Sequence, residues 1–361
     1  MRIVQVTPRY FPTVGGVEIV VQKISEMLVE KGNEVVVYSV DKHPRLPSVE
    51  NINGVVVKRF TPLYDDPLYL PQAKFLLSLR KEKADIIHSH NIHTLPPLLA
   101  SMCRKGDQKL LLQPHYHRYG QSSLRHSLLE LYRKSFCNLI LLQSNAILVN
   151  SNYERQIINE DFPHAKNVLL LPEGIEVNDT KKVERKPEMP KRILYVGALK
   201  RYKNVHKLLV GFACMTRDGD KGFRLVIVGD GPEHGNLVNL ASQLGVSELV
   251  DWKQGLSRQQ LLNEYASASV FVMLSPLESF SRVVYDALIV GVPVVVLNFG
   301  ALSHLVEEGF AEGVNSLTKE SVAEALLKAE QKTYRRISLD NDSFLDWESY
   351  VERLVEIYRK L

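Results

Sequence analysis

The sequence is poor in cysteine, which excludes several classes of small stapled or metal-bound fold. Only three cysteines occur in 361 residues, at Cys103, Cys137 and Cys214, and they are far apart. The number is odd and no paired spacing is present, so neither a disulfide framework nor a zinc site is expected. We expect each cysteine to be a small apolar residue in a reducing, cytoplasmic environment.

Long apolar runs are also missing. No stretch approaches the roughly 20 apolar residues that a membrane span requires. Met1–Val6 already has a strand pattern, without the apolar segment of a signal peptide. The net charge of +4 is too small to indicate nucleic-acid binding, but it suits an anionic ligand such as a nucleotide diphosphate. The sequence therefore predicts a cytoplasmic protein that could contact the inner membrane face peripherally.

The sequence does contain a regular alternation of short β-branched runs with longer amphipathic stretches. In the first half, strands are expected at Ile3–Val6, Glu34–Val40, Val55–Arg59, Asp85–His88, Lys109–Gln113 and Ala146–Val149. Helices are expected between many of them, at Val17–Glu30, Ala73–Lys83, Leu95–Arg104 and Ser123–Phe136. This alternation is typical of βαβ units and a doubly wound parallel sheet.

A charged, proline-containing break at 179–191 separates this pattern from a second one. Strands are expected again at Arg192–Val196, Phe223–Val228, Leu249–Trp252, Val270–Leu274 and Pro293–Leu297, with helices at Asn204–Met215, Glu233–Leu244, Ser257–Ala266 and Ser279–Ile289. We predict two Rossmann-like α/β domains, 1–178 and 192–344, joined by a linker at 179–191 and facing each other across a cleft. The last helix, 345–361, is expected to pack back on the first domain.

A glycine pair follows the first expected strand. Thr7–Glu18 reads TPRYFPTVGGVE, and Gly15 and Gly16 precede a helix. Such a turn lets the backbone approach a ligand, and the helix N-terminus offers unpaired N–H groups to phosphate or sugar oxygens. The alternative is a plain βα turn that requires positive φ.

The strongest pattern is Ser275–Val294, which reads SPLESFSRVVYDALIVGVPV. A strand ends before it and a helix is expected to start near Ser279. The amides of Phe280, Ser281 and Arg282 would then face an anion. Glu278 could accept hydrogen bonds from sugar hydroxyls and Asp286 from ribose hydroxyls. The alternative is that both carboxylates are ordinary charges of a helix start or surface.

This stretch resembles the E-x₇-E signature of the retaining glycosyltransferases of family 4, which have the GT-B fold. The residues shared with that signature are Glu278, Ser279, Phe280, Ala287, Gly291, Pro293 and Val294. The sequence departs from it at Ser281, where glycine is usual, and at Asp286, where glutamate is usual.

A second part of the resemblance is Tyr195–Asn204, YVGALKRYKN. The family has an arginine and a lysine here that bind the donor pyrophosphate. Lys203 matches the lysine, whereas Ala198 stands at the arginine position. Lys200 or Arg201 could supply the missing charge, and the alternative for all three basic residues is a solvated loop.

Two further turns resemble family elements. Leu171–Glu176 resembles the Pro-Asn-Gly-Ile-Asp turn, with Glu173 in place of asparagine, and Val228–Pro232 resembles the Gly-x-Gly-Pro turn. The glycines of the latter imitate a dinucleotide fingerprint, but the spacing is one residue too long, which argues against NAD.

Histidines cluster after two strands of the first half, in Asp85–His93 and Gln113–Gly120. The resemblance implies that His115 lies near the donor sugar, where a neutral imidazole can bind a hydroxyl or stabilise charge. His90 and His93 are expected to line the acceptor pocket. The histidine cluster has a metal-like composition, but no cysteine or acidic-pair pattern accompanies it, so no metal is expected. The DND at 340–342 imitates a metal motif but precedes a helix.

The resemblance implies a metal-independent hexosyltransferase without a cofactor. A nucleoside diphosphate sugar would be the co-substrate, and a glycan or lipid-linked acceptor would receive the sugar. Two alternatives stay open: a non-catalytic binding or scaffold subunit, and a sugar-nucleotide epimerase on the same fold. The basic amphipathic stretches Phe75–Lys83 and Leu124–Lys134 could rest on an anionic bilayer or pack one face on the core.

Overall fold

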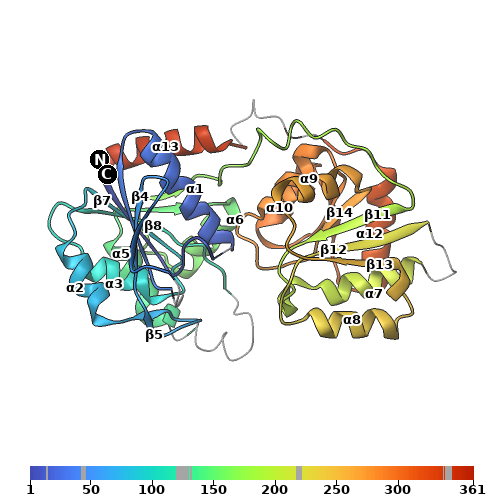
Figure 1. The fold of residues 1–361 in the computed structure, drawn as a ribbon, viewed down its shortest axis with the longest axis horizontal. Helices are drawn as coiled ribbons and strands as arrows, with labels where there is room; N and C mark the ends of the chain where they lie inside the picture. Colours follow the sequence, from blue (N-terminus) through green and yellow to red (C-terminus); the bar gives the residue numbers. More distant parts are fainter. Residues whose placement is uncertain are drawn as a thin grey trace. The chain divides into compact units, whose positions relative to one another are not determined.

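The computed structural model of the chain has two compact units (Figure 1). Unit 1 comprises Met1–Gly174 and Trp347–Leu361, and unit 2 comprises Ile175–Asp346. The structure describes residues 1–13, 15–41, 46–118, 130, 132–216, 222–335, 337 and 344–361. The DND at 340–342 lies outside these residues, as do residues 123–129 and 131 of the expected helix Ser123–Phe136, which contains the basic stretch Leu124–Lys134.

Unit 1 is built on an eight-stranded sheet. Its spatial order is β10 (Val168–Leu170), β9 (Ala146–Val149), β8 (Lys109–Gln113), β7 (Ile86–His90), β1 (Arg2–Thr7), β2 (Glu34–Ser39), β4 (Val55–Arg59) and β3 (Val49–Ile52). All neighbours pair in parallel except β3, which is antiparallel to β4. The strand order reverses between β1 and β7, and ligands of doubly wound sheets bind at the strand carboxyl ends beside such a reversal.

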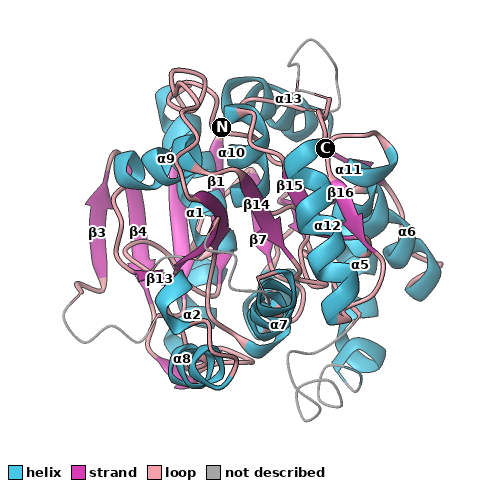
Figure 2. Cartoon of the chain, turned by 90° about the vertical axis from the view of Figure 1, so that its right-hand side faces the viewer, coloured by secondary structure: helices cyan, strands magenta, loops and turns pink. Residues whose placement is uncertain are grey.

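The helices around this sheet include those expected at Val17–Glu30, Ala73–Lys83, Leu95–Arg104 and 345–361, whereas the helices at 138–143 and 152–161 were not expected (Figure 2). They are α1 (Gly16–Glu30), α2 (Ala73–Lys81), α3 (Leu95–Cys103), the π-helical turn η1 (Arg133–Cys137), α5 (Asn138–Gln143), α6 (Asn152–Asp161) and α13 (Trp347–Lys360). A small two-stranded sheet, β5 (Pro62–Tyr64) with β6 (Leu70–Pro71), lies in the same unit. In α1, Val20, Ile24 and Leu28 are fully buried at helical spacing, which explains why this segment packs as a helix.

Unit 2 has a six-stranded sheet in which every described pair is parallel. Its order is β13 (Val250–Lys253), β12 (Phe223–Val228), β11 (Lys191–Val196), β14 (Val270–Met273), β15 (Val294–Leu297) and β16 (Glu312–Val314). Its longer helices are α7 (Val205–Met215), α8 (His234–Gln243), α9 (Arg258–Ser267), α10 (Arg282–Val290) and α12 (Lys319–Gln331); the short turns are η2 (Arg201–Lys203), η3 (Ser247–Leu249), η4 (Gly300–Leu302) and α11 (Ser303–Glu307). The order reverses between β11 and β14. Two doubly wound parallel α/β sheets are therefore confirmed.

The expected linker 179–191 is counted in unit 2. Thr180 is fully buried, the N–H of Lys186 donates to the carbonyl of Ala266 at 2.8 Å, and Lys191 already begins β11. These main-chain contacts hold a segment that has few apolar residues of its own. The last helix begins at Trp347, and the buried Leu345 before it accepts a main-chain bond from Ile175.

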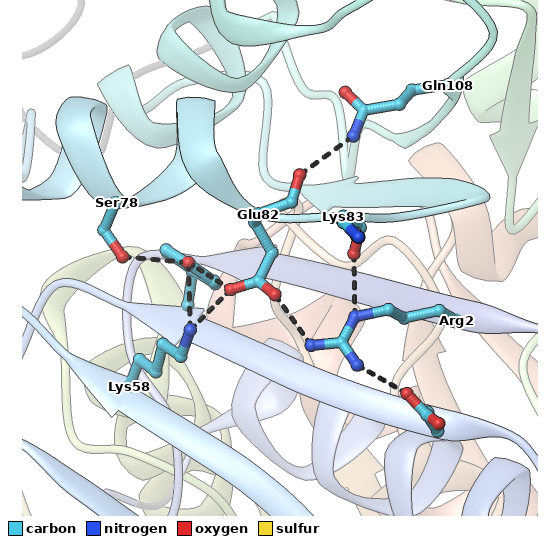
Figure 3. A network of polar contacts seen from close by, with 8 residues as sticks. Arg2, Lys58, Ser78, Glu82, Lys83 and Gln108 are labelled. Atoms are coloured by element: carbon cyan, nitrogen blue, oxygen red, sulfur yellow. Dashed lines mark hydrogen bonds and ion pairs between the residues drawn. The ribbon is translucent and has the colours of Figure 1, made fainter.

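A charged network joins the amino end of β1 to neighbouring segments (Figure 3). The guanidinium of Arg2 contacts Glu82 at 2.8 Å and Glu34 at 2.5 Å, and its Nε donates to the carbonyl of Lys83. The other Glu82 oxygen accepts from the Tyr38 hydroxyl at 2.6 Å and from Lys58 at 2.5 Å. Arg2, Glu34 and Glu82 lie at or before the amino ends of β1, β2 and β7, and Glu82 also binds Tyr38 and Lys58, later residues of β2 and β4. The network therefore stabilises the arrangement of these strands.

Within the described parts of the chain, we find no helix with the length and apolar character needed to pass through a lipid bilayer.

Candidate functional site

In unit 2 the chain brings Lys203 and Glu278 together where the strand order reverses. Lys203 follows β11 and Glu278 follows β14, and these two strands are neighbours. Lys203 Nζ forms an ion pair with Glu278 Oε1, and the two side chains are 14% and 12% exposed. Burial alone would lower the pKa of Lys203, but the charge of Glu278 outweighs it and the pKa is raised. The lysine is therefore held in its charged form, paired with Glu278, at the carboxyl edge of this sheet.

Asn204 fixes the position of Lys203 beside β14. Its φ of 58° is in the left-handed region, which asparagine tolerates better than most residues. The side-chain amide of Asn204 donates to the carbonyl of Leu274 at 2.9 Å, just after the end of β14. The turn after β11 is thus tied directly to the strand that leads to Glu278.

The other basic residues of this turn are more exposed than Lys203. Arg201 is 68% exposed and lies 3.8 Å from Glu233. Lys200 is exposed, and its carbonyl accepts from the N–H of Lys203. At Ala198 the carbonyl accepts from the Tyr195 hydroxyl at 3.1 Å. The structure therefore gives a buried, oriented charge only to Lys203 within this turn.

Helix α10 begins later than the sequence pattern predicts. It starts at Arg282, so Ser279 and Phe280 lie in the preceding loop, and Ser281 is its N-cap with φ of 78°. Phe280 is only 5% exposed and stacks on Tyr285, with ring centroids 4.1 Å apart. Packing of Phe280 into the core requires a sharp left-handed turn at Ser281 before the helix can begin. Of the three amides expected in the first turn, those of Phe280, Ser281 and Arg282, only the amide of Arg282 lies within α10, at its first position.

Asp286 is engaged within the protein. Its carboxylate receives two bonds from the guanidinium of Arg258, at 2.5 and 2.9 Å, and Arg258 also donates to the Thr180 hydroxyl at 3.1 Å. The hydrogen bond that Arg258 donates to Asp286 is the largest cause of the raised pKa of Arg258. The ribose contact that the sequence predicts for Asp286 would have to share or displace this ion pair.

In unit 1, Gly15 and Gly16 lie at the start of α1. Gly15 is the N-cap with extended φ and ψ of −164° and 179°, so the alternative of a turn that needs positive φ does not apply to it. A Cβ at Gly15 would lie 2.2 Å from a carboxylate oxygen of Glu18, whereas one at Gly16 would meet nothing within 4 Å. Glu18 in turn accepts from Arg9 Nε at 2.8 Å. A side chain at 15 would displace the end of the Glu18 side chain, so this contact favours glycine without requiring it.

His90 is placed differently from the acceptor-lining role expected for it. It lies within β7, is fully buried, and contacts Gln5 Oε1 through Nε2 at 2.8 Å. His88 points to the same side of the strand, because strand side chains alternate, and it contacts the Tyr358 hydroxyl at 2.7 Å. Burial lowers the pKa of His88 to about 3 and that of His90 well below its usual value. Both rings are neutral core groups.

His93 lies in the loop after β7 and is 9% exposed. Its Nε2 accepts from the main-chain N–H of His117 at 3.1 Å, and the two rings are 4.2 Å apart. Burial is the first cause that lowers the pKa of His93 well below its usual value, followed by the neighbouring His117 and His115. His93 is therefore neutral as well.

His115 belongs to a polar cluster that the sequence pattern only partly indicates. Its Nδ1 lies 3.2 Å from Asn150 Nδ2 and 3.8 Å from Glu173 Oε1. Asn150 follows β9 and Glu173 follows β10, so three adjacent strand ends supply these groups. Asn150 was missed, although a polar residue directly after the apolar strand Ala146–Val149 is a signal that could have identified it.

Glu154 supports this cluster from α6. Its two carboxylate oxygens accept from the N–H of Tyr116 at 2.6 Å and of Asn150 at 2.8 Å. Burial raises the pKa of Glu154 to about 7 against these two bonds. Among the residues that the structure describes, no group of three or more His, Cys, Asp or Glu side chains is arranged to hold a metal ion.

Two family models match this chain, one in each half. Residues 14–179 match the model "Glycosyltransferase Family 4", and residues 176–341 match "Glycosyl transferases group 1". An uncharacterized glycosyltransferase of Methanocaldococcus jannaschii is 29% identical over 330 residues, which cover 85% of this chain and 83% of that protein.

Solved structures have the same fold. Sucrose-phosphate synthase from Thermosynechococcus elongatus superimposes with a TM-score of 0.77 at 19% identity, over 99% of this chain and 98% of that one. Anabaena HepE, solved in complex with UDP and glucose, gives 0.72 at 15% identity over 99% of each chain. With both halves matched and both sheets in place, this chain belongs to glycosyltransferase family 4 and has the GT-B fold.

Proposed function

We propose that the protein is a retaining, metal-independent glycosyltransferase. It moves a sugar from a nucleoside diphosphate sugar to a hydroxyl of a glycan or lipid-linked acceptor. The observation that carries the proposal is the buried Lys203–Glu278 pair where the strand order of unit 2 reverses. A lysine at this place can bind the diphosphate as it leaves, and the carboxylate can accept from sugar hydroxyls.

Catalysis of this reaction depends mainly on positioning the two substrates and on stabilising the negative charge of the leaving diphosphate. Lys203 and the amide of Arg282 stabilise the departing diphosphate, while the exposed Lys200 and Arg201 raise the local positive potential. With retention of configuration, an oxygen of the leaving diphosphate takes the proton of the acceptor hydroxyl on the same face. His115 and His93 of unit 1 contact sugar hydroxyls. Gly16 leaves room for ligand at the start of α1, whereas the space beside Gly15 is taken by the carboxylate of Glu18. Apart from the donor, no cofactor takes part.

The test is binding and turnover with defined donors. UDP, GDP and ADP and their sugars are titrated calorimetrically in the presence of EDTA, and donor hydrolysis is followed by phosphorus NMR. We expect one nucleotide class to bind, with EDTA making no difference, and Glu278→Ala to abolish turnover while the far-UV circular dichroism spectrum is retained. Loss of binding on adding EDTA, or full turnover by Glu278→Ala, would contradict the proposal.

A non-catalytic binding subunit is the second candidate, and the Arg258–Asp286 pair favours it. The carboxylate that would bind ribose is already satisfied, and Ala198 and Ser281 also depart from the family pattern. Such a subunit would show no donor turnover with any acceptor tried. A sugar-nucleotide epimerase would instead convert the donor with no acceptor present, which sugar analysis by NMR detects.

Peripheral contact with an anionic membrane is the further part of the proposal. The exposed face of α2 carries Lys74, Leu77 and Lys81 at helical spacing, and Leu77 is 60% exposed. An apolar side chain between two lysines suits an interface of anionic headgroups. Co-sedimentation with vesicles rich in phosphatidylglycerol is expected for the parent and reduced for Leu77→Glu, and equal sedimentation of both would contradict it.

A further inference from the structure

The orientation of the Asn150 side chain is determined by its neighbours in unit 1. Its Oδ1 accepts from Gln113 Nε2 at 2.7 Å, and its Nδ2 donates to Glu173 Oε1 at 3.1 Å. The amide is buried, with 1% of its surface exposed. A reversed amide would place Oδ1 against the carboxylate of Glu173, where two acceptors face each other without a proton. The carboxylate therefore requires the amide nitrogen on its side.

The second proton of the Asn150 amide is directed to His115. Nδ2 lies 3.2 Å from His115 Nδ1, so this ring nitrogen faces a donor. A ring nitrogen that faces a donor must present its lone pair. In a neutral imidazole only one nitrogen carries a proton, so that proton must lie on Nε2.

We propose that Asn150, oriented by Glu173 and Gln113, fixes the proton of His115 on Nε2. Nε2 is buried in this structure. A substrate oxygen that reaches it would therefore meet a hydrogen-bond donor, and His115 does not act as a base through this nitrogen. Asn150 and Glu173 are positioning residues, because they act through His115. The statement about substrate rests on the proposed function, whereas the position of the proton does not.

Glu173 makes this arrangement a property of this particular chain. It stands where the family pattern has asparagine, and a carboxylate can only accept when it is ionised. The titratable groups near His115 include His90, with ring centroids 6.0 Å apart, His88 and His93, and Glu154, which accepts from the N–H of Asn150. A donor N–H aimed at a sugar hydroxyl, or at an oxygen that gains negative charge, stabilises it electrostatically.

The proton position can be read by NMR without any substrate. The protein is labelled with ¹⁵N-histidine, and His115 is assigned by the signal lost in His115→Gln. Two-bond ¹H–¹⁵N correlations at neutral pH are expected to show a protonated Nε2 and a bare Nδ1. A protonated Nδ1, or an imidazolium at neutral pH, would overturn the proposal.

A charge-changing variant tests the part played by Asn150. Asn150→Asp replaces the donor by an acceptor beside Nδ1, so we expect the His115 ring to become protonated on Nδ1 as well and to titrate at higher pH. The matched control is Asn152→Asp, which adds the same charge two residues away, at an exposed position in the first turn of α6 where Asn152 accepts from Arg155. An unchanged His115 spectrum in a folded Asn150→Asp protein would contradict the inference. If that variant does not fold, the parent spectrum alone still decides.

Turnover gives an independent measurement. With a donor identified, Asn150→Asp is expected to lower kcat by at least about tenfold with little change in the KM for donor, while Asn152→Asp matches the parent. Equal kcat values for the two variants would overturn the donor role. If no nucleotide sugar binds at all, the proposed function fails, and the NMR result for His115 stands separately.

Discussion

Arg258 and Asp286 form a two-point ion pair, with Nη1 2.5 Å from Oδ2 and Nη2 2.9 Å from Oδ1. The carboxylate is 9% exposed and the guanidinium 36%. The acidic residue that the sequence pattern assigns to a ribose is thus held by a cation from the first turn of α9. If Asp286 binds ribose as proposed, donor binding and the stability of unit 2 are linked through this pair.

Arg258→Met is expected to destabilise the protein without weakening nucleotide binding. The variant leaves Asp286 without its ion partner, and we expect a loss of about 1–2 kcal/mol, reduced by the partial exposure of the arginine. In the proposed donor site Arg258 would compete with ribose hydroxyls for the same oxygens, so nucleotide affinity should be equal to or higher than in the parent. Urea unfolding and calorimetric titration measure the two quantities.

Arg224→Met is the matched control for this experiment. Arg224 also makes two bonds to a carboxylate, Asp251, but both side chains are 34% exposed. Its removal is expected to change stability by about 0–1 kcal/mol. A tenfold loss of nucleotide affinity in Arg258→Met would instead mean that Arg258 itself touches the nucleotide.

Lys203→Ala is expected to weaken nucleoside diphosphate binding by about 1.5–3 kcal/mol, which is roughly 10- to 150-fold in Kd. The physical reason is the loss of a charge-assisted bond at a site with little access to water. Lys207→Ala removes the same charge from an exposed position one turn further on and should bind like the parent. The double variant Lys203→Ala/Glu278→Ala should recover stability, because no buried charge is left unpaired, but it should not recover binding. Parental affinity in the single variant would refute the diphosphate contact.

Ser281→Gly is expected to stabilise the protein by about 0.5–1 kcal/mol. Ser281 has φ of 78°, where a Cβ costs about 1–2 kcal/mol, and glycine offsets part of this gain by its greater freedom in the unfolded chain. Ser279→Gly is the control, since residue 279 has no positive φ and the same change there should be neutral or destabilising. Thermal unfolding of both variants gives the comparison, and a lower Tm for Ser281→Gly would show that the serine side chain makes a compensating contact.

Glu82→Gln is expected to lower stability at neutral pH and to remove part of its acid dependence. Burial alone would raise the pKa of Glu82, but bonds from Lys58, Tyr38 and Arg2 lower it to about 2. The folded-state pKa is thus below the unfolded value. The stability that ionised Glu82 contributes is therefore fully present above about pH 4.5 and is lost as pH falls toward 2. After allowance for solvent screening we expect about 1–2 kcal/mol at pH 7. Urea midpoints of parent and variant are compared from pH 7 to pH 3. A difference between them that stays constant over this range would show that Glu82 is not a source of the acid dependence.

Much of the fold follows from local patterns in the sequence, because buried parallel strands are short β-branched runs. The expected strand Val270–Leu274 differs by one residue from β14, and Arg192–Val196 differs by one from β11. The start of α10 was misplaced by three residues, because packing of Phe280 on Tyr285 is a tertiary contact. A local helix pattern carries no information about it.

The polar partners of the site were the least predictable part. Arg258 lies 28 residues before Asp286, and Asn150 lies 23 residues before Glu173. Their contacts depend on which strands become neighbours, and sequence spacing alone does not determine that order. Family resemblance identified Lys203 and Glu278, but it did not indicate that they neutralise each other. The full burial of His90 follows from the central place of β7 in the sheet.

The chain crosses between its two units twice, at 174–175 and at 346–347, because α13 is assigned to unit 1. In genetic terms unit 2 is an insertion. Consider a chimera in which everything after residue 174 comes from a relative. Its α13 would be foreign, and the contact between Tyr358 of α13 and His88 of β7 would join a foreign helix to the native sheet. Exchange of donor-side halves between relatives therefore requires two junctions, with α13 kept alongside the sheet to which it belongs.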